Sequence, residues 1–117
     1  MNDIDLSELR ARFTDVAIVD VRTRGEYEGT LGNGCDPRQG HIPGARHLDV
    51  SRMVGLDAAA IAQELGVQPG VEVIAYCHSG SRSAVAAEIL RGVGYEARNY
   101  VGSWHEWSSH DDLPIET

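Results

Sequence analysis

The sequence predicts an α/β fold built around a largely parallel sheet. Short apolar runs typical of buried strands alternate along the chain with segments whose apolar residues recur at helical spacing. A helix between two strands carries the chain back across the sheet, which makes consecutive strands parallel. The length of 117 residues suits one domain, and the composition, with 42% hydrophobic and 24% charged residues, is typical of a globular protein.

The first half of the chain predicts one helix, two strands and a long loop. The helix rests on the spacing of Leu6, Leu9 and Phe13, with Asp5 or Ser7 as its N-terminal cap. Glycines and a proline make the loop exposed, and its length suggests a functional or inserted segment. The predicted elements are a helix over residues 4–13, a buried strand over 16–21, the loop over 29–40 and a short strand over 46–49.

The second half predicts two further helices and two further strands. The run from Val71 to Tyr76 is the strongest strand, because four of its six residues are β-branched or aromatic. The helix after it places Val85 and Leu90 on one apolar face. The predicted elements are a helix over residues 57–65 ended by Gly66, a strand over 71–76, a helix over 83–93 ended by Gly94 and a strand over 97–101.

The charge balance excludes some partners. Eighteen acidic and ten basic side chains give a formal net charge of −8. Such a surface repels duplexes and anionic bilayers, so we expect neither nucleic acid nor a membrane as a partner. The acidic first residues lack the cationic and apolar regions of a signal peptide, which favours a cytoplasmic protein with both cysteines reduced.

Cys77 is the candidate catalytic residue. It follows the strongest predicted strand directly, and parallel sheets bind their ligands where strands end and helices begin. The small residues after it let the backbone N–H groups turn toward the sulfur, and we expect Ser83 to cap the next helix. A helix N-terminus and a nearby arginine lower the pKa of a thiol, which predicts a reactive thiolate. The predicted substrate-binding residues form the loop His78, Ser79, Gly80, Ser81, Arg82 and Ser83.

Two side chains of this loop have alternative roles. Arg82 offers a planar, charged fork to an anionic donor, or else forms an ion pair with an acidic neighbour. His78 either assists the donor or acceptor or is merely a neighbour of the nucleophile.

The loop from Cys77 to Ser83 resembles the persulfide-forming loop of the rhodanese sulfurtransferases, and the resemblance extends over about residues 5–115. It implies a single rhodanese-like domain over residues 1–117, with a central, mostly parallel sheet flanked by helices on both faces. The supporting motifs, in the order in which the family has them, are Asp20-Val21-Arg22, Glu26-Tyr27, Gly40 to Ala45, Gly94-Tyr95, Gly102-Ser103-Trp104 and Leu113-Pro114.

The resemblance implies a thiosulfate sulfurtransferase. A small anionic donor such as thiosulfate would pass its sulfane sulfur to Cys77, and the resulting persulfide would pass it to a thiol, to cyanide or to a protein acceptor. No cofactor is implied. Asp20 and Arg22 follow a buried strand near the expected site, where we predict a supporting charge pair that organises loops.

Two other functions stay open. A cysteine phosphatase or arsenate reductase on the related scaffold needs five residues between its cysteine and arginine, whereas four separate Cys77 from Arg82. A non-catalytic rhodanese-like sulfur carrier or regulatory module is the other alternative, although Cys77 and its whole loop are present.

Cys35 and the histidines receive lesser roles. Cys35, in the loop over 29–40, is either a resolving thiol for Cys77 or, as we favour, an incidental loop cysteine. His41, within a turn, is expected to be a hydrogen-bonded structural residue. The spacing of the five histidines shows no paired zinc motif that includes a cysteine, so no metal site is expected.

Overall fold

The fold is a five-stranded parallel sheet between two layers of helices. The computed structural model describes residues 3–117, so the first two residues of the domain predicted over 1–117 lie outside the described residues. The strands lie in the order β1-β5-β4-β2-β3, and all their pairings are parallel. Their bounds are β1 Asp3–Ile4, β2 Ala17–Asp20, β3 Arg46–His47, β4 Glu72–Tyr76 and β5 Glu96–Tyr100.

Three of the helices were predicted and three were not. Asp5 caps the first helix by accepting a hydrogen bond from the backbone N–H of Glu8, and Gly66 ends the fourth in a left-handed conformation. The unpredicted helices α2, α3 and α6 have four to six residues, too few for a helical period to show in the sequence. The helices are α1 Leu6–Arg12, α2 Arg24–Glu28, α3 Val50–Met53, α4 Ala58–Leu65, α5 Ser81–Gly92 and α6 Ser103–Ser108.

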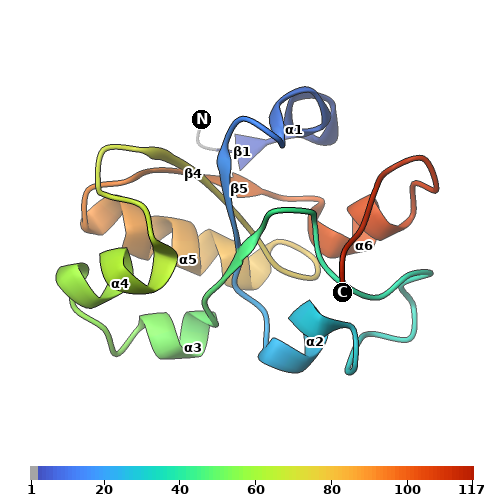
Figure 1. Cartoon of the computed structure of the whole chain (residues 1–117), viewed down its shortest axis with the longest axis horizontal. Helices are drawn as coiled ribbons and strands as arrows, with labels where there is room; N and C mark the ends of the chain where they lie inside the picture. Colours follow the sequence, from blue (N-terminus) through green and yellow to red (C-terminus); the bar gives the residue numbers. More distant parts are fainter. Residues whose placement is uncertain (1–2) are drawn as a thin grey trace.

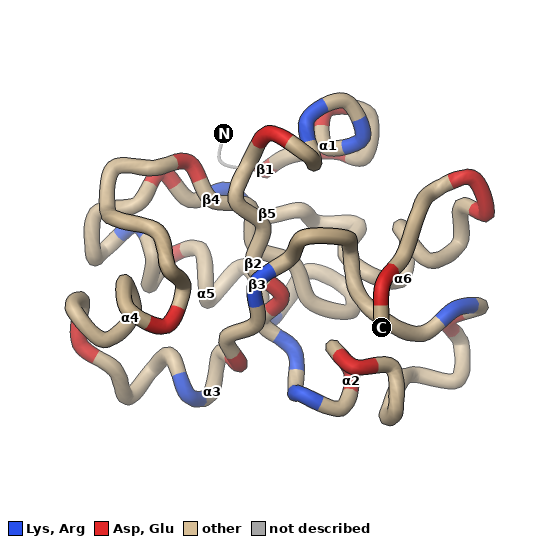
Figure 2. The backbone as a smooth tube through the Cα atoms, viewed as in Figure 1, with Lys and Arg blue, Asp and Glu red and all other residues tan. Residues whose placement is uncertain are grey.

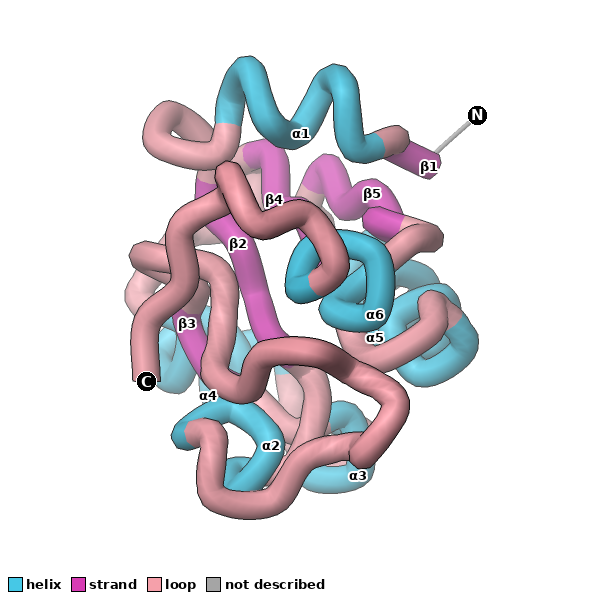
Figure 3. The backbone as a smooth tube through the Cα atoms, turned by 90° about the vertical axis from the view of Figure 1, so that its right-hand side faces the viewer, coloured by secondary structure: helices cyan, strands magenta, loops and turns pink. Residues whose placement is uncertain are grey.

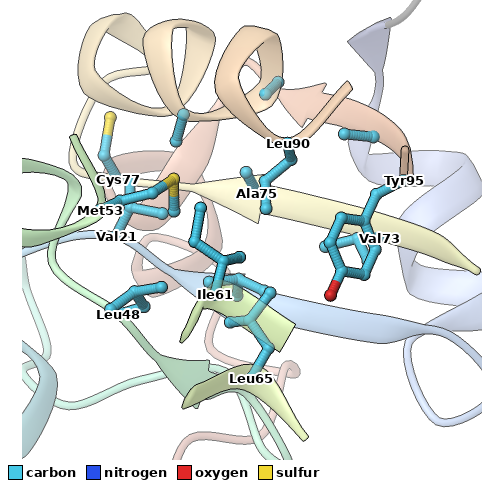
Figure 4. Packing of buried hydrophobic residues seen from close by; sticks show 14 residues of the cluster. Val21, Leu48, Met53, Ile61, Leu65, Val73, Ala75, Cys77, Leu90 and Tyr95 are labelled. Atoms are coloured by element: carbon cyan, nitrogen blue, oxygen red, sulfur yellow. The ribbon is translucent and has the colours of Figure 1, made fainter. Parts of the chain in front are cut away.

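The sheet has a hydrophobic core on each face, which confirms the predicted α/β class. Successive side chains of β4 alternate between the two cores: Val73 and Ala75 face one, and Ile74 and Tyr76 face the other. Helices α3, α4 and α5 cover the first face, and α1 and α6 cover the second (Figures 1 and 3). Cys77 lies at one end of the first core, beside Val21 and Met53 (Figure 4).

One predicted core position is wrong. Val85 is 52% exposed, and the buried face of α5 is formed by Ala86, Ala87 and Leu90 instead. Small alanines let the helix approach the sheet closely, and a pattern search for large apolar residues gives them too little weight.

The strand order places the expected ligand-binding position where β2 and β4 end. From β2 the chain crosses to β3 on one side, and from β4 it crosses to β5 on the other, so the connections diverge between β2 and β4. Parallel sheets bind their ligands at such a switch point, outside the carboxyl ends of the strands. Within residues 3–117, no helix has the length and apolar character needed to cross a bilayer.

Candidate active site

The Cys77 thiol lies at the carboxyl end of β4, in a cradle of hydrogen-bond donors. The backbone N–H of Gly80 lies 3.1 Å from Sγ, and the Ser83 hydroxyl lies 3.3 Å from it. Burial of the thiol raises its pKa. Hydrogen bonds from the Ser83 hydroxyl and from the backbone N–H groups of Ser83, Gly80 and Ser79 outweigh burial, so the pKa of Cys77 is below its ordinary value. The site therefore stabilises a thiolate.

Ser83 does not cap helix α5, contrary to the sequence prediction. Helix α5 begins at Ser81, its N-cap is Gly80, and no side chain caps it, so the expectation that Ser83 caps this helix is wrong. Its hydroxyl is fully buried and points at the Cys77 sulfur. Gly80 permits this path because its φ is 98° and because a Cβ there would lie 2.6 Å from the carbonyl oxygen of Val101.

Ser103 is a site residue that the sequence analysis missed. Its hydroxyl accepts a hydrogen bond from the backbone N–H of Cys77 at 3.0 Å and lies 2.8 Å from the Tyr100 carbonyl oxygen, to which it donates its proton. Ser103 has a φ of 54°, and it is the one non-glycine residue with positive φ in the described part of the chain. This strained conformation fixes the backbone of Cys77 from the next loop of the sheet. Its only sequence signal was its place in the Gly-Ser-Trp motif.

Arg82 is engaged by an acidic partner. Its guanidinium donates one hydrogen bond to each carboxylate oxygen of Glu26, at 2.9 and 3.1 Å. Glu26 also caps α2, because its side chain accepts a hydrogen bond from the backbone N–H of Thr23. Of the two alternatives for Arg82, the structure shows the ion pair, and a donor anion would have to compete with Glu26.

Asp20 and Arg22 form a fully buried ion pair next to the site. Arg22 donates from Nη2 to Asp20 at 2.7 Å and to the Gly40 carbonyl at 2.6 Å, and Tyr76 donates to Asp20 at 2.7 Å. The guanidinium carbon lies 5.1 Å from the centre of the Trp104 ring. The pair joins β2, β4 and the loop over 29–40. Figure 2 shows that basic and acidic residues are interspersed along much of the described backbone, so other ion pairs can form as well.

His41 lies in one setting, and His78 and Cys35 lie together in another. His41 is buried, is stacked on Tyr27 with ring centroids 3.8 Å apart, and contacts the Tyr27 carbonyl through Nδ1. His78 extends from the Cys77 loop to Asp36 at 3.1 Å and to Cys35 at 3.8 Å. Cys35 therefore contacts the loop that follows Cys77, although no disulfide joins the two cysteines.

Comparison with known proteins identifies the family. A model of the rhodanese-like domain matches residues 5–110. The chain belongs to this family. The observed fold is that of the rhodanese-like domain, as the sequence resemblance implied.

Curated relatives carry names from sulfur transfer. Thiosulfate sulfurtransferases of Pseudomonas aeruginosa and Azotobacter vinelandii are 34% and 36% identical to the chain over 111 residues, which is 87% of this chain and 40% of each relative. A sulfur carrier protein of Thermus thermophilus is 33% identical over 115 residues, 85% of this chain and 40% of the relative. The chain thus spans about two fifths of the length of these relatives.

Two solved structures of sulfurtransferases are similar to this chain over nearly its whole length. The crystal structure of a probable thiosulfate sulfurtransferase superposes with a TM-score of 0.84 at 40% identity, covering 99% of this chain and 48% of that chain. A human single-domain sulfurtransferase superposes with a TM-score of 0.75 at 27% identity, covering 96% of this chain and 99% of that chain.

Proposed function

We propose that this domain is a sulfurtransferase that moves a sulfane sulfur from thiosulfate or a related donor to a thiol or cyanide through a Cys77 persulfide. The observation that carries the proposal is the Cys77 cradle, in which Gly80 and Ser83 donate to one sulfur atom. Relatives named thiosulfate sulfurtransferase support the choice of donor. The chemistry needs a free thiol, so we keep the reducing cytoplasm as the proposed location.

The first half-reaction loads the sulfur. The Cys77 thiolate attacks the outer sulfur of thiosulfate, the bond between the two donor sulfurs breaks, and sulfite leaves with the bonding electron pair. The negative charge then rests on the terminal persulfide sulfur. Because the N–H groups of the loop are fixed by the start of α5, they stabilise this charge without rearranging, as an oxyanion hole does.

The second half-reaction transfers the terminal sulfur to an acceptor. Cyanide or a thiolate attacks the terminal sulfur, the sulfur–sulfur bond of the persulfide breaks, and the Cys77 thiolate is regenerated. With cyanide the product is thiocyanate, and with a small or protein thiol it is a new persulfide. The relative named as a sulfur carrier protein supports a protein thiol as the acceptor.

The cradle does not suit phosphoryl transfer. A phosphatase loop needs an arginine where this chain has Ser83, and the Ser83 side chain is buried against the cysteine sulfur. The arginine that is present, Arg82, is paired with Glu26. The geometry therefore favours sulfur over phosphate as the transferred group.

Mass spectrometry tests the proposal directly. After exposure to thiosulfate, the intact protein should gain one sulfur, and peptide mapping should place it on Cys77 and not on Cys35. Cys77→Ser should fold normally, because the volume change is small, yet turn over no thiosulfate. Thiosulfate-to-cyanide turnover that persists in this variant would rule out the Cys77 mechanism.

A further inference from the structure

Four side chains that bind metals in other proteins converge beside the Cys77 loop. Cys35 and Asp36 come from the loop over 29–40, His78 follows Cys77, and His105 lies on α6. One donor atom from each residue lies within 4.8 Å of the other three. The spacing of these residues in the sequence hid this cluster, because they come from three separate segments.

Five of the six distances between the ligand atoms are near those of a tetrahedral zinc site. With Zn–N and Zn–O bonds of about 2.0 Å and a Zn–S bond of about 2.3 Å, tetrahedral ligand atoms lie about 3.3 Å apart, or about 3.5 Å apart when one is sulfur. Asp36 Oδ1 lies 3.1 Å from His78 Nε2 and 2.8 Å from His105 Nδ1. Cys35 Sγ lies 3.8 Å from each of these nitrogens and 4.0 Å from Asp36 Oδ1. These five distances lie within about 0.5 Å of the tetrahedral values, and the sixth pair, the two histidine nitrogens, lies within 4.8 Å.

Backbone hydrogen bonds join the two segments that carry the histidines. The N–H of His105 donates to the His78 carbonyl at 3.0 Å, and the N–H of Trp104 donates to the Cys77 carbonyl at 2.9 Å. These bonds join the start of α6 to the Cys77 loop, so the two rings are brought together by the fold, with their centroids 5.4 Å apart.

The loop that carries the other two residues is anchored just as firmly. Arg38 donates to the carbonyl oxygens of Ser108, His110 and Leu113 at 3.1, 2.7 and 2.9 Å, and Trp104 Nε1 donates to the Arg38 carbonyl at 3.0 Å. Asn33 shapes the turn by accepting a hydrogen bond from the Cys35 N–H at 3.0 Å. A preorganised set of ligands loses little entropy when it binds an ion.

Burial and charge also suit a divalent cation. The Asp36 side chain is 1% exposed, whereas that of His105 is 52% exposed and Cys35 lies at the surface, which gives an ion a route of entry. A thiolate and a carboxylate neutralise the two charges of the ion, and the two imidazoles bind it as neutral groups. Asp36 Oδ1 lies within hydrogen-bond distance of both histidine rings.

We propose that Cys35, Asp36, His78 and His105 bind one Zn²⁺ ion, with the Cys35 thiol releasing its proton to solvent. Thiolate, imidazole and carboxylate are the ligands that zinc takes in proteins, and four protein ligands make a closed site with no open position for substrate. The ion would tie the loop over 29–40 to the residue after the nucleophile. The proposal goes beyond sulfur transfer and does not rest on it.

Metal titration of the whole chain tests the site. Isothermal titration of the metal-free, reduced protein with Zn²⁺ should show one equivalent bound, and Cys35→Ser and His105→Ala should each weaken binding at least tenfold. His110→Ala is the matched control, because His110 lies in the same segment but outside the cluster, and it should bind zinc as the parent does.

Co²⁺ identifies the sulfur ligand. The parent protein should show a thiolate-to-cobalt charge-transfer band together with the strong visible bands of a tetrahedral ion. Both should persist in Cys77→Ser and disappear in Cys35→Ser, which separates the proposed site from the nucleophile. Absence of stoichiometric zinc binding by the parent would overturn the proposal, as would loss of the cobalt bands in Cys77→Ser with retention in Cys35→Ser. Circular dichroism of each metal-free variant establishes that it is folded.

Discussion

Arg82 and Glu26 form a two-point ion pair between α5 and α2, with hydrogen bonds of 2.9 and 3.1 Å. The pair fixes the one arginine of the Cys77 loop on a carboxylate, so the guanidinium is not free to receive a sulfonate. Donor binding by this arginine would therefore involve an exchange of one anion for another, whereas the backbone N–H of Gly80 already faces the Cys77 sulfur.

Arg82→Ala should impair the use of thiosulfate more than that of an uncharged persulfide donor. A charge-assisted hydrogen bond contributes ~1.5 to 3 kcal/mol, and the need to displace Glu26 offsets part of it. We expect kcat/KM for thiosulfate to fall about tenfold, which corresponds to ~1.4 kcal/mol, with a smaller loss for the uncharged donor. Glu26→Gln should raise kcat/KM for thiosulfate, because it releases the guanidinium. Equal losses with both donors in Arg82→Ala would assign that residue a purely structural role.

The same ion pair should make stability depend on acid pH. Burial raises the pKa of Glu26, but its hydrogen bonds with Arg82 and Thr23 prevail and lower the pKa from 4.5 to about 2. Because the folded pKa lies below the unfolded one, the ionised carboxylate adds stability above pH 4.5, and this contribution disappears as the pH falls toward 2.

Chemical unfolding at several pH values checks this dependence. The difference in free energy of unfolding between the parent and Glu26→Gln should stay constant from about pH 7 to about pH 5 and shrink below that. Glutamine keeps an oxygen that can cap α2, so the comparison isolates the charge. Glu64→Gln is the control: Glu64 pairs with Arg52 at the surface, where solvent screens the pair, and the change should be smaller. A difference that does not vary with pH would contradict the linkage.

Ser83→Ala should raise the pKa of the Cys77 thiol. The variant removes the side-chain hydrogen bond that favours the thiolate and leaves the opposing effect of burial unchanged. The pH profile of alkylation by iodoacetamide should move to higher pH, and sulfur loading at neutral pH should slow. Ser81→Ala is the matched control, because Ser81 is exposed at the first position of the same helix. If the two profiles coincide, the Ser83 hydroxyl does not set the thiol pKa.

The sequence was sufficient to predict the class of fold, four of the strands and the position of Cys77 at the end of β4. Strand β4 and helix α4 carry strong local signals, namely a β-branched run and a helix bounded by Asp57 and Gly66. Strand β1 has two residues and is defined by its pairing with β5, which is distant in the sequence. Such an element has no local signature to read.

Contacts between distant segments limited the prediction of the site. The hydroxyls of Ser83 and Ser103 look alike in the sequence, yet one faces the Cys77 sulfur and the other holds its backbone N–H. The partner of Arg82 comes from α2, a helix too short to be predicted. The cluster around Asp36 depends on a loop whose path is set by Arg38 and tertiary hydrogen bonds.

The buried pair of Asp20 and Arg22 should contribute far more to stability than a surface pair. In Arg22→Met, the Asp20 carboxylate stays buried without its counter-ion, at an expected cost of ~3 to 5 kcal/mol in the free energy of unfolding. In Arg52→Met, which breaks the exposed pair with Glu64, the expected cost is ~0 to 1 kcal/mol. Unfolding in urea measures both.

A double variant separates the lost charge from the lost packing. Asp20→Asn in the Arg22→Met background removes the uncompensated carboxylate while its side-chain oxygen can still accept the Tyr76 hydrogen bond. If the buried charge causes the loss, the double variant should be more stable than Arg22→Met alone, because the two substitutions are coupled through direct contact. The single variant Asp20→Asn is measured as well. If the double variant loses as much stability as Arg22→Met and Asp20→Asn lose together, the destabilisation comes from packing of the Arg22 side chain against Tyr76 and Trp104, and not from the charge.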